Sequence, residues 1–81
     1  MEVFIVYGIS DCPYCLRACA DLMDEDKQYV FVNADFSKDY RRQLCKKYTW
    51  QTFPIVLLSI DNKESFIGGY QELTSHLSRK A

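Results

Sequence analysis

An α/β fold built on one small mixed sheet is predicted by two features of this sequence. A strand, a helix and a second strand follow one another within about thirty residues, the pattern of a βαβ unit with parallel strands and a right-handed crossover. Two later strands are separated only by a short turn, and strands connected in this way pair antiparallel. Residues 1–81 are enough for one modest hydrophobic core, so we expect a single domain.

The βαβ unit begins with Glu2–Tyr7, which is β-branched or aromatic almost throughout and closes at Gly8. This composition is typical of a central strand that is covered on both faces. A helix is predicted from Pro13 to about Asp24, and Tyr29–Val32 is the second strand. The apolar residues expected to form the buried stripe of the helix are Cys15, Leu16, Cys19, Leu22 and Met23.

A second helix is predicted from its cap at Ser37 to about Lys47, with Tyr40 and Leu44 on one face. Pro54 then precedes the apolar run Ile55–Leu58. Proline cannot donate to a sheet ladder, so it belongs at the start of that buried strand.

The last part of the chain reads as a hairpin followed by a helix. Asp61-Asn62 supplies the turn, and Glu64–Ile67 forms a short strand that ends at Gly68-Gly69. The closing helix begins at Tyr70, and its basic end at Arg79-Lys80 suits the helix dipole.

Composition excludes several classes of partner. The net charge is −1 with acidic and basic residues intermixed, so we expect neither nucleic acid nor an anionic membrane as a partner. No apolar run approaches about 18 residues and the start does not read as a signal peptide, so neither membrane insertion nor secretion is expected. The reducing cytoplasm is therefore the expected compartment.

The motif Cys12-Pro13-Tyr14-Cys15 holds two thiols at a predicted helix start. Proline is favoured at the first helical position, which places Cys12 at the N-cap and Cys15 in the first turn. Helix geometry separates their Cα atoms by about 5 Å, a distance that a disulfide accepts. The positive end of the dipole favours a thiolate, so we assign Cys12 as the nucleophile and Cys15 as the resolving thiol.

Two other roles for this motif are weaker. A metal site usually needs a second ligand pair, and the chain offers only Cys19, Cys45 and His76, so we expect no metal. A structural disulfide across so short a loop would give little entropic stabilisation. We interpret Cys19 as a core thiol and leave Cys45 unassigned and half-buried.

A basic segment, residues 38–47, contains Arg41, Arg42, Lys46 and Lys47. The simplest interpretation is a solvated helix face, with anion binding as the alternative.

Three motifs in this order resemble a small glutaredoxin: Cys12–Cys15, the tripeptide Thr52-Phe53-Pro54, and Gly68-Gly69. The resemblance covers essentially the whole chain. It implies the thioredoxin fold, a four-stranded mixed sheet in the order 2-1-3-4 with three flanking helices. It also implies glutathione as reductant and partner.

The resemblance further implies roles for single residues. Cys12 would attack and Cys15 resolve, with Tyr14 lining the cleft. Pro54 would be cis and lie opposite the dithiol, and the backbone of Phe53 would pair with the cysteinyl part of glutathione in the manner of a strand edge.

The two carboxylates of glutathione would bind elsewhere. Gly69 and the N–H groups of Tyr70 and Gln71 would hold the γ-glutamyl carboxylate at a helix start, and Arg41 the glycyl carboxylate. Where the family commonly has lysine three residues before the first cysteine, this chain has Ile9, and the acidic Asp11 adjoins Cys12.

The aromatic residues admit two interpretations. They could form a rim that docks a protein, or each could simply pack in the core or in a turn. The residues concerned are Tyr7, Tyr14, Trp50, Phe53 and Tyr70.

Together these points predict a monomeric, cytoplasmic, glutathione-dependent thiol–disulfide oxidoreductase. Its expected substrates are protein disulfides and glutathione mixed disulfides, and ribonucleotide reductase is the best-known client of the family. Two alternatives stay open: a redoxin that takes electrons from a thioredoxin reductase, and an iron–sulfur carrier.

Overall fold

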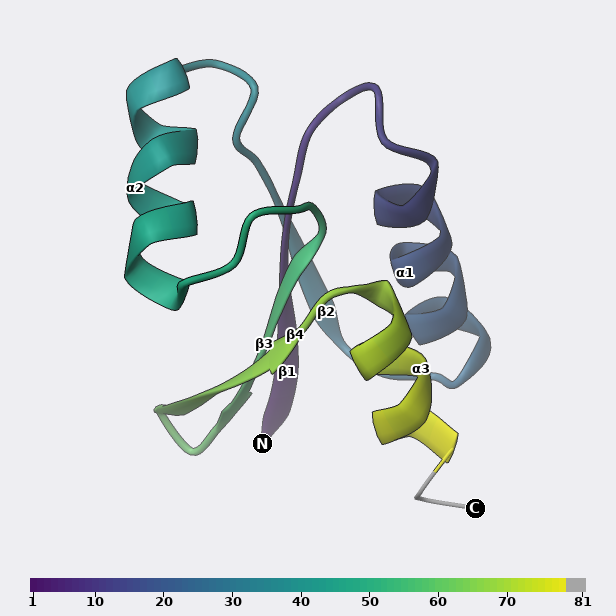
Figure 1. Cartoon of the computed structure of the whole chain (residues 1–81). Helices are drawn as coiled ribbons and strands as arrows, with labels where there is room; N and C mark the ends of the chain where they lie inside the picture. Colours follow the sequence, from purple (N-terminus) through teal and green to yellow (C-terminus); the bar gives the residue numbers. More distant parts are fainter. Residues whose placement is uncertain (79–81) are drawn as a thin grey trace.

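A computed structural model describes residues 1–78 as strands and helices in the order β-α-β-α-β-β-α (Figure 1). The predicted basic helix end at Arg79-Lys80 lies outside the described residues. The elements are β1 (Glu2–Gly8), α1 (Pro13–Asp24), β2 (Tyr29–Asn33), α2 (Lys38–Tyr48), β3 (Ile55–Ile60), β4 (Lys63–Gly68) and α3 (Tyr70–Ser78).

The four strands form one sheet in the order β2-β1-β3-β4. β1 lies parallel to β2 and antiparallel to β3, and β4 pairs antiparallel with β3. The predicted βαβ unit, the hairpin and the mixed sheet are thus all confirmed.

The hairpin turn has a simple sequence cause. Asp61 and Asn62 both adopt positive φ, 50° and 70°, between the paired residues Ile60 and Lys63. Asp and Asn tolerate this left-handed conformation, and a two-residue turn of this hand matches the twist of the strands.

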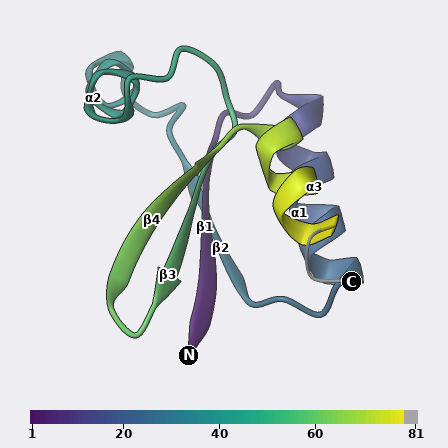
Figure 2. The ribbon, with the colours of Figure 1, turned by 60° about the horizontal axis from the view of Figure 1, so that its bottom comes forward.

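The sheet is covered on both faces, by α1 and α3 on one and by α2 on the other (Figure 2). Alternate residues of β1 point to opposite faces, so Phe4 and Val6 join the core under α1 and α3, while Ile5 and Tyr7 pack toward α2. The first core comprises Phe4, Val6, Ala18, Leu22, Val56, Leu58 and Leu73. The second comprises Ala34, Leu44, Ile55 and Leu57. This confirms that β1 is central and buried on both sides.

The stripe predicted for α1 was too wide. Leu16 and Met23 are 68% and 63% exposed, whereas Ala18 is fully buried together with Leu22. At about 100° per residue, the stripe of residues 15, 18 and 22 faces the sheet, and Leu16 and Met23, which follow the first and last of these positions, turn toward solvent. Cys19 is only partly buried, at the margin of the first core, where burial raises the pKa of its thiol.

Candidate functional site

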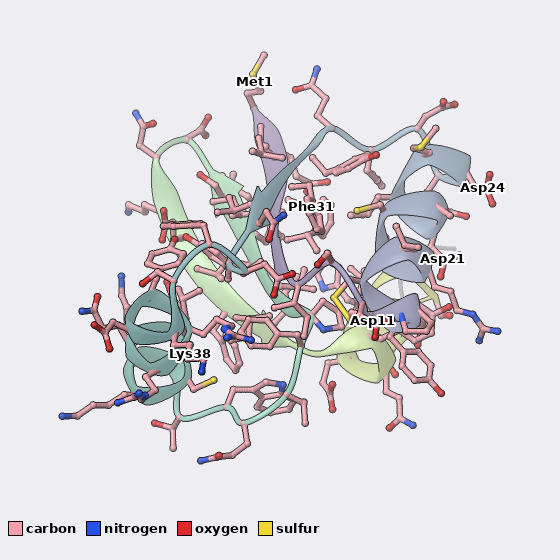
Figure 3. All side chains as sticks on the ribbon, turned by 90° about the horizontal axis from the view of Figure 1, so that it is seen from above. Met1, Asp11, Asp21, Asp24, Phe31 and Lys38 are labelled. Carbon is pink, nitrogen blue, oxygen red and sulfur yellow. A yellow bond between two sulfur atoms is a disulfide. The ribbon has the colours of Figure 1, made fainter. Side chains whose placement is uncertain are left out.

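Cys12 and Cys15 form a disulfide at the start of α1, visible as the yellow bond near Asp11 in Figure 3. Their Cα atoms are 5.3 Å apart. Cys12 is the N-cap, with φ −141° and ψ 97°, and its Sγ accepts a hydrogen bond of 3.3 Å from the N–H of Cys15. Pro13 begins the helix. The sequence therefore predicted the local geometry of the pair correctly.

The two sulfurs differ in access to solvent. Cys15 is 1% exposed, whereas Cys12 is only partly buried. Gly8 contributes to this enclosure, because a Cβ there would lie 2.9 Å from the Sγ of Cys15 and 2.7 Å from the ring of Phe31. An incoming disulfide can therefore reach Cys12 much more readily than Cys15.

The loop before β3 faces the dithiol. The Phe53–Pro54 peptide bond is cis, as the resemblance implied, and Pro54 is buried. The carbonyl oxygen of Phe53 lies 3.6 Å from the Sγ of Cys12. The Phe53 backbone therefore lies within reach of a molecule bonded to that sulfur.

A pocket of about 420 Å³ is formed by this loop, the first turn of α1 and the start of α3. We call it the dithiol pocket. It is lined by Tyr14, Trp50, Thr52, Phe53, Pro54, Gly69, Tyr70, Gln71 and Glu72. It brings together every residue predicted to bind glutathione except Arg41, which lines a separate hollow on α2 and lies 3.8 Å from Asp35 in an ion pair.

Sequence reasoning missed Glu72 at this pocket. The N–H of Gly69 donates a 2.9 Å hydrogen bond to Oε1 of Glu72, which is half of a capping box. The signal was present, since Glu72 stands three residues after Gly69. The N–H groups of Tyr70 and Gln71 have no acceptor inside the helix, because a helix leaves its first N–H groups unpaired. They remain suited to an anion.

Trp50 and Thr52 were also absent from the predicted binding residues. Trp50 packs edge-on against Phe66, and its indole Nε1 is buried without a hydrogen-bond partner among residues 1–78. Trp50 was predicted from the sequence only as part of the aromatic rim, and its place two residues before Thr52 and three before Phe53 is the second signal for this position.

The predicted aromatic rim is only partly present. Tyr14 and Tyr70 lie at the pocket with ring centroids 5.6 Å apart, and the Tyr70 hydroxyl donates a 2.7 Å hydrogen bond to Asp21. This bond to Asp21 raises the pKa of Tyr70. Tyr7 instead packs against the second core, where burial raises the pKa of its hydroxyl. Packing therefore accounts for Tyr7, while Tyr14, Trp50, Phe53 and Tyr70 line the dithiol pocket.

The loop before Cys12 is tied to the loop after β2. The backbone N–H of Ser10 donates a 3.1 Å hydrogen bond to Oδ2 of Asp35, and the Ser10 hydroxyl donates to the same oxygen. These bonds, with Arg41 nearby, lower the pKa of Asp35. Ile9 packs against the second core. The loop that leads into the dithiol is thus anchored at Ser10 by hydrogen bonds and at Ile9 by packing.

Within residues 1–78, no helix is both long and apolar enough to cross a membrane. The same part of the chain holds no group of three or more His, Cys, Asp or Glu side chains that could bind a metal ion.

Several known proteins are similar to this chain in sequence or in structure. A family model described as Glutaredoxin matches residues 4–63. Reduced glutaredoxin of Escherichia coli is 27% identical, with 95% of this chain and 94% of that chain covered and a TM-score of 0.65. Glutaredoxin 1 of Francisella tularensis is 18% identical, with 99% and 96% covered and a TM-score of 0.80, and at that identity it shows the thioredoxin fold alone.

A curated relative is much longer than this chain. The chain is 30% identical over 88 residues to a putative malate dehydrogenase 1B of Bos taurus, a match that takes in 94% of this chain and 19% of that protein. The family model covers most of the chain and includes the dithiol and the cis-proline loop. The chain therefore belongs to the glutaredoxin family, whose members are thiol–disulfide oxidoreductases.

Proposed function

We propose that this protein reduces protein disulfides and glutathione mixed disulfides, with glutathione as its own reductant. The observation that carries the proposal is the unequal exposure of the dithiol. Cys15 is 1% exposed and Cys12 is partly exposed beside a pocket lined by the cis-proline loop and the start of α3. An exposed attacking sulfur and an enclosed resolving sulfur are what sequential thiol–disulfide exchange requires.

The reaction with a protein disulfide proceeds in two exchanges. The Cys12 thiolate attacks one client sulfur, forming a mixed disulfide and releasing the other client sulfur as a thiolate, which takes up a proton. The Cys15 thiolate then attacks the Cys12 sulfur and closes the internal disulfide, so the client leaves with both thiols reduced. Two molecules of glutathione reopen the internal disulfide, and they leave as glutathione disulfide.

Glutathione fits the dithiol pocket through backbone groups. Its cysteinyl sulfur would bond to the Sγ of Cys12. Its cysteinyl backbone would pair with the backbone of Phe53, whose carbonyl oxygen lies 3.6 Å from the Sγ of Cys12. The unpaired N–H groups of Tyr70 and Gln71 would hold its γ-glutamyl carboxylate. We assign Arg41, in the neighbouring hollow, to the glycyl carboxylate.

The source of electrons is tested directly. We would supply NADPH with either glutathione plus glutathione reductase or thioredoxin reductase alone, and follow NADPH oxidation on a disulfide substrate. The proposal expects turnover with the glutathione system. Turnover only with thioredoxin reductase would contradict it and favour the second kind of redoxin.

The proposal also covers the domain organisation, the compartment, the oligomeric state and a client of the protein. We propose that residues 1–81 fold as one domain, that the protein is a cytoplasmic monomer, and that ribonucleotide reductase is among its clients. Metal-free, colourless protein after isolation is expected, and visible absorbance from a bound cluster would support an iron–sulfur carrier instead.

A further inference from the structure

One face of α2 carries a groove of about 660 Å³ that the reaction above uses only at Arg41. We call it the α2 groove, and its lining is Lys38, Arg41, Arg42, Cys45, Lys46 and Gln51. Residues 38, 41, 42, 45 and 46 recur at helical spacing, so they share one side of the helix. The side chains that pack toward the sheet, Tyr40, Leu44 and Tyr48, lie on another side.

The groove is strongly cationic. Five of the ten Lys and Arg residues of the chain lie between residues 38 and 47, and four of them line the groove. Asp39, the one acidic residue of α2, does not line it. Arg41 pairs with Asp35, but within residues 1–78 no carboxylate lies in ion-pair range of Lys38, Arg42 or Lys46. These three cations are therefore available to an external anion.

The groove adjoins the dithiol pocket. Trp50 and Thr52 line the dithiol pocket, and Gln51 between them lines the α2 groove. Residues 50–52 are thus the shared wall of the two hollows. A polypeptide whose cysteine is bonded to Cys12 can cross this wall and continue along α2.

The charge distribution gives such a partner one orientation. Figure 3 shows Asp21 and Asp24 on α1 at one side of the molecule, Asp11 just before that helix, and Lys38 on α2 at the other side. An acidic segment is attracted toward α2 and repelled from α1, and such complementarity steers encounter and fixes orientation.

We infer that the α2 groove docks an acidic polypeptide segment that lies close in sequence to the disulfide of a client protein. The inference rests on the proposed function, because it concerns the partner of the Cys12 exchange. Lys38, Arg42 and Lys46 are the recognising groups. One peptide carboxylate satisfies one cation, so this groove suits a run of Asp and Glu better than it suits glutathione alone.

The test is a single turnover of the pre-reduced protein without glutathione. Two disulfide peptides are compared, identical except that one has a Glu-rich tail and the other has Gln at the same positions, each made with the tail on either side of the disulfide. We expect the Glu peptide to react about tenfold faster at low ionic strength. The advantage should disappear near 0.5 M salt, where the screening length falls below about 5 Å.

The variants locate the effect. The triple variant Lys38→Gln, Arg42→Gln, Lys46→Gln should reduce the Glu peptide and the Gln peptide at the same rate. Lys47→Gln is the matched control, because Lys47 is on the same helix but lies over the Tyr48 ring, outside the groove. Lys47→Gln should keep the preference for the Glu peptide.

Three results would overturn the inference: equal rates for the two peptides with the unaltered protein, a preference that survives in the triple variant, or a single-stranded oligonucleotide that binds the groove more tightly than the Glu peptide. Failure to reduce either peptide would instead contradict the proposed oxidoreductase function. The two proposals can therefore fail separately.

Discussion

At the scale of the residue, the site depends on two cysteines that differ in exposure although they share one helical turn. Cys12 caps α1 and is accessible, while Cys15 faces the core beside Gly8. The proline between them, at the first helical position, fixes that difference because it commits the chain to helix directly after Cys12.

The first prediction separates the two thiols. Cys15→Ser should keep substantial activity on glutathionylated substrates, because free glutathione can remove the glutathionyl group from Cys12, and should lose most reduction of protein disulfides. Cys12→Ser should lose both. Parallel assays of both reactions measure this, with Cys19→Ala as a control that changes stability but not the ratio of the activities. A Cys15→Ser protein that is inactive on both substrates would contradict the role assignment.

A second prediction concerns Ile9, which stands three residues before Cys12. Ile9→Lys should lower the pKa of the Cys12 thiol in the reduced protein, because a cation near the helix start favours the thiolate and offsets the adjacent Asp11. The aliphatic stem of lysine can keep part of the packing that Ile9 makes with the second core. Thiolate absorbance during a pH titration measures the effect, with Ile9→Met as the uncharged control. The same titration midpoint in both variants would refute it.

At the scale of the element, the site depends on how loops and helix starts are tied together. Ser10 ties the loop before α1 to Asp35 before α2, and Glu72 caps α3 at Gly69. These two hydrogen bonds fix segments that border the dithiol pocket and the α2 groove. The periodicity of apolar residues in the sequence does not reveal them.

Asp35 should make stability depend on pH. Its hydrogen bonds from Ser10 lower its pKa from the ordinary value of 3.8, so its contribution is fully present above 3.8 and is lost as the pH falls through the lower folded value. Asp35→Asn should remove this dependence. Urea unfolding at a series of acidic pH values measures it, and the exposed Asp24→Asn serves as the control. A constant stability difference between Asp35→Asn and the unaltered protein across that range would speak against the Ser10 tie.

The cap of α3 gives another prediction. Glu72→Ala should lower the free energy of unfolding by about 1 kcal/mol, because the Gly69 N–H loses its acceptor and the helix start loses a negative charge. Glu72→Gln should lose less, since its amide oxygen can still accept that hydrogen bond. Urea unfolding of both variants at neutral pH provides the comparison. Equal losses would indicate that the charge, and not the hydrogen bond, supports the helix.

At the scale of the whole molecule, one sheet separates two cores and supports both hollows. β1 and β3 supply side chains to both cores, so neither core can form without the sheet that the other core also needs. The protein should therefore unfold as one unit.

Neighbouring residues of β3 test this unity. Leu58 belongs to the core under α1 and α3, and Leu57 to the core under α2. Leu57→Ala and Leu58→Ala should each lower the free energy of unfolding by about 2–5 kcal/mol. In both variants the transition seen by far-UV circular dichroism should coincide with that seen by fluorescence of Trp50, the single tryptophan. Separate transitions in either variant would show two independent units.

The sequence by itself determined the elements and the local geometry of the dithiol. Periodicity, caps and turn residues act over a few positions, so Ser37, Pro13 and Asp61-Asn62 were sufficient to predict a helix cap, a helix start and a hairpin turn. The cis proline and the strand order came from the family resemblance of three motifs, and both are present in the structure.

The tertiary structure alone decided which loops meet. Arg41 lies in a second hollow apart from the dithiol pocket, Trp50 and Thr52 line that pocket, Ser10 meets Asp35, and Leu16 and Met23 turn to solvent. Each of these depends on how helices rotate and pack against the sheet, which places together residues far apart in the chain. A local pattern carries no record of that packing, because the free energy that selects it comes from burial across the whole molecule.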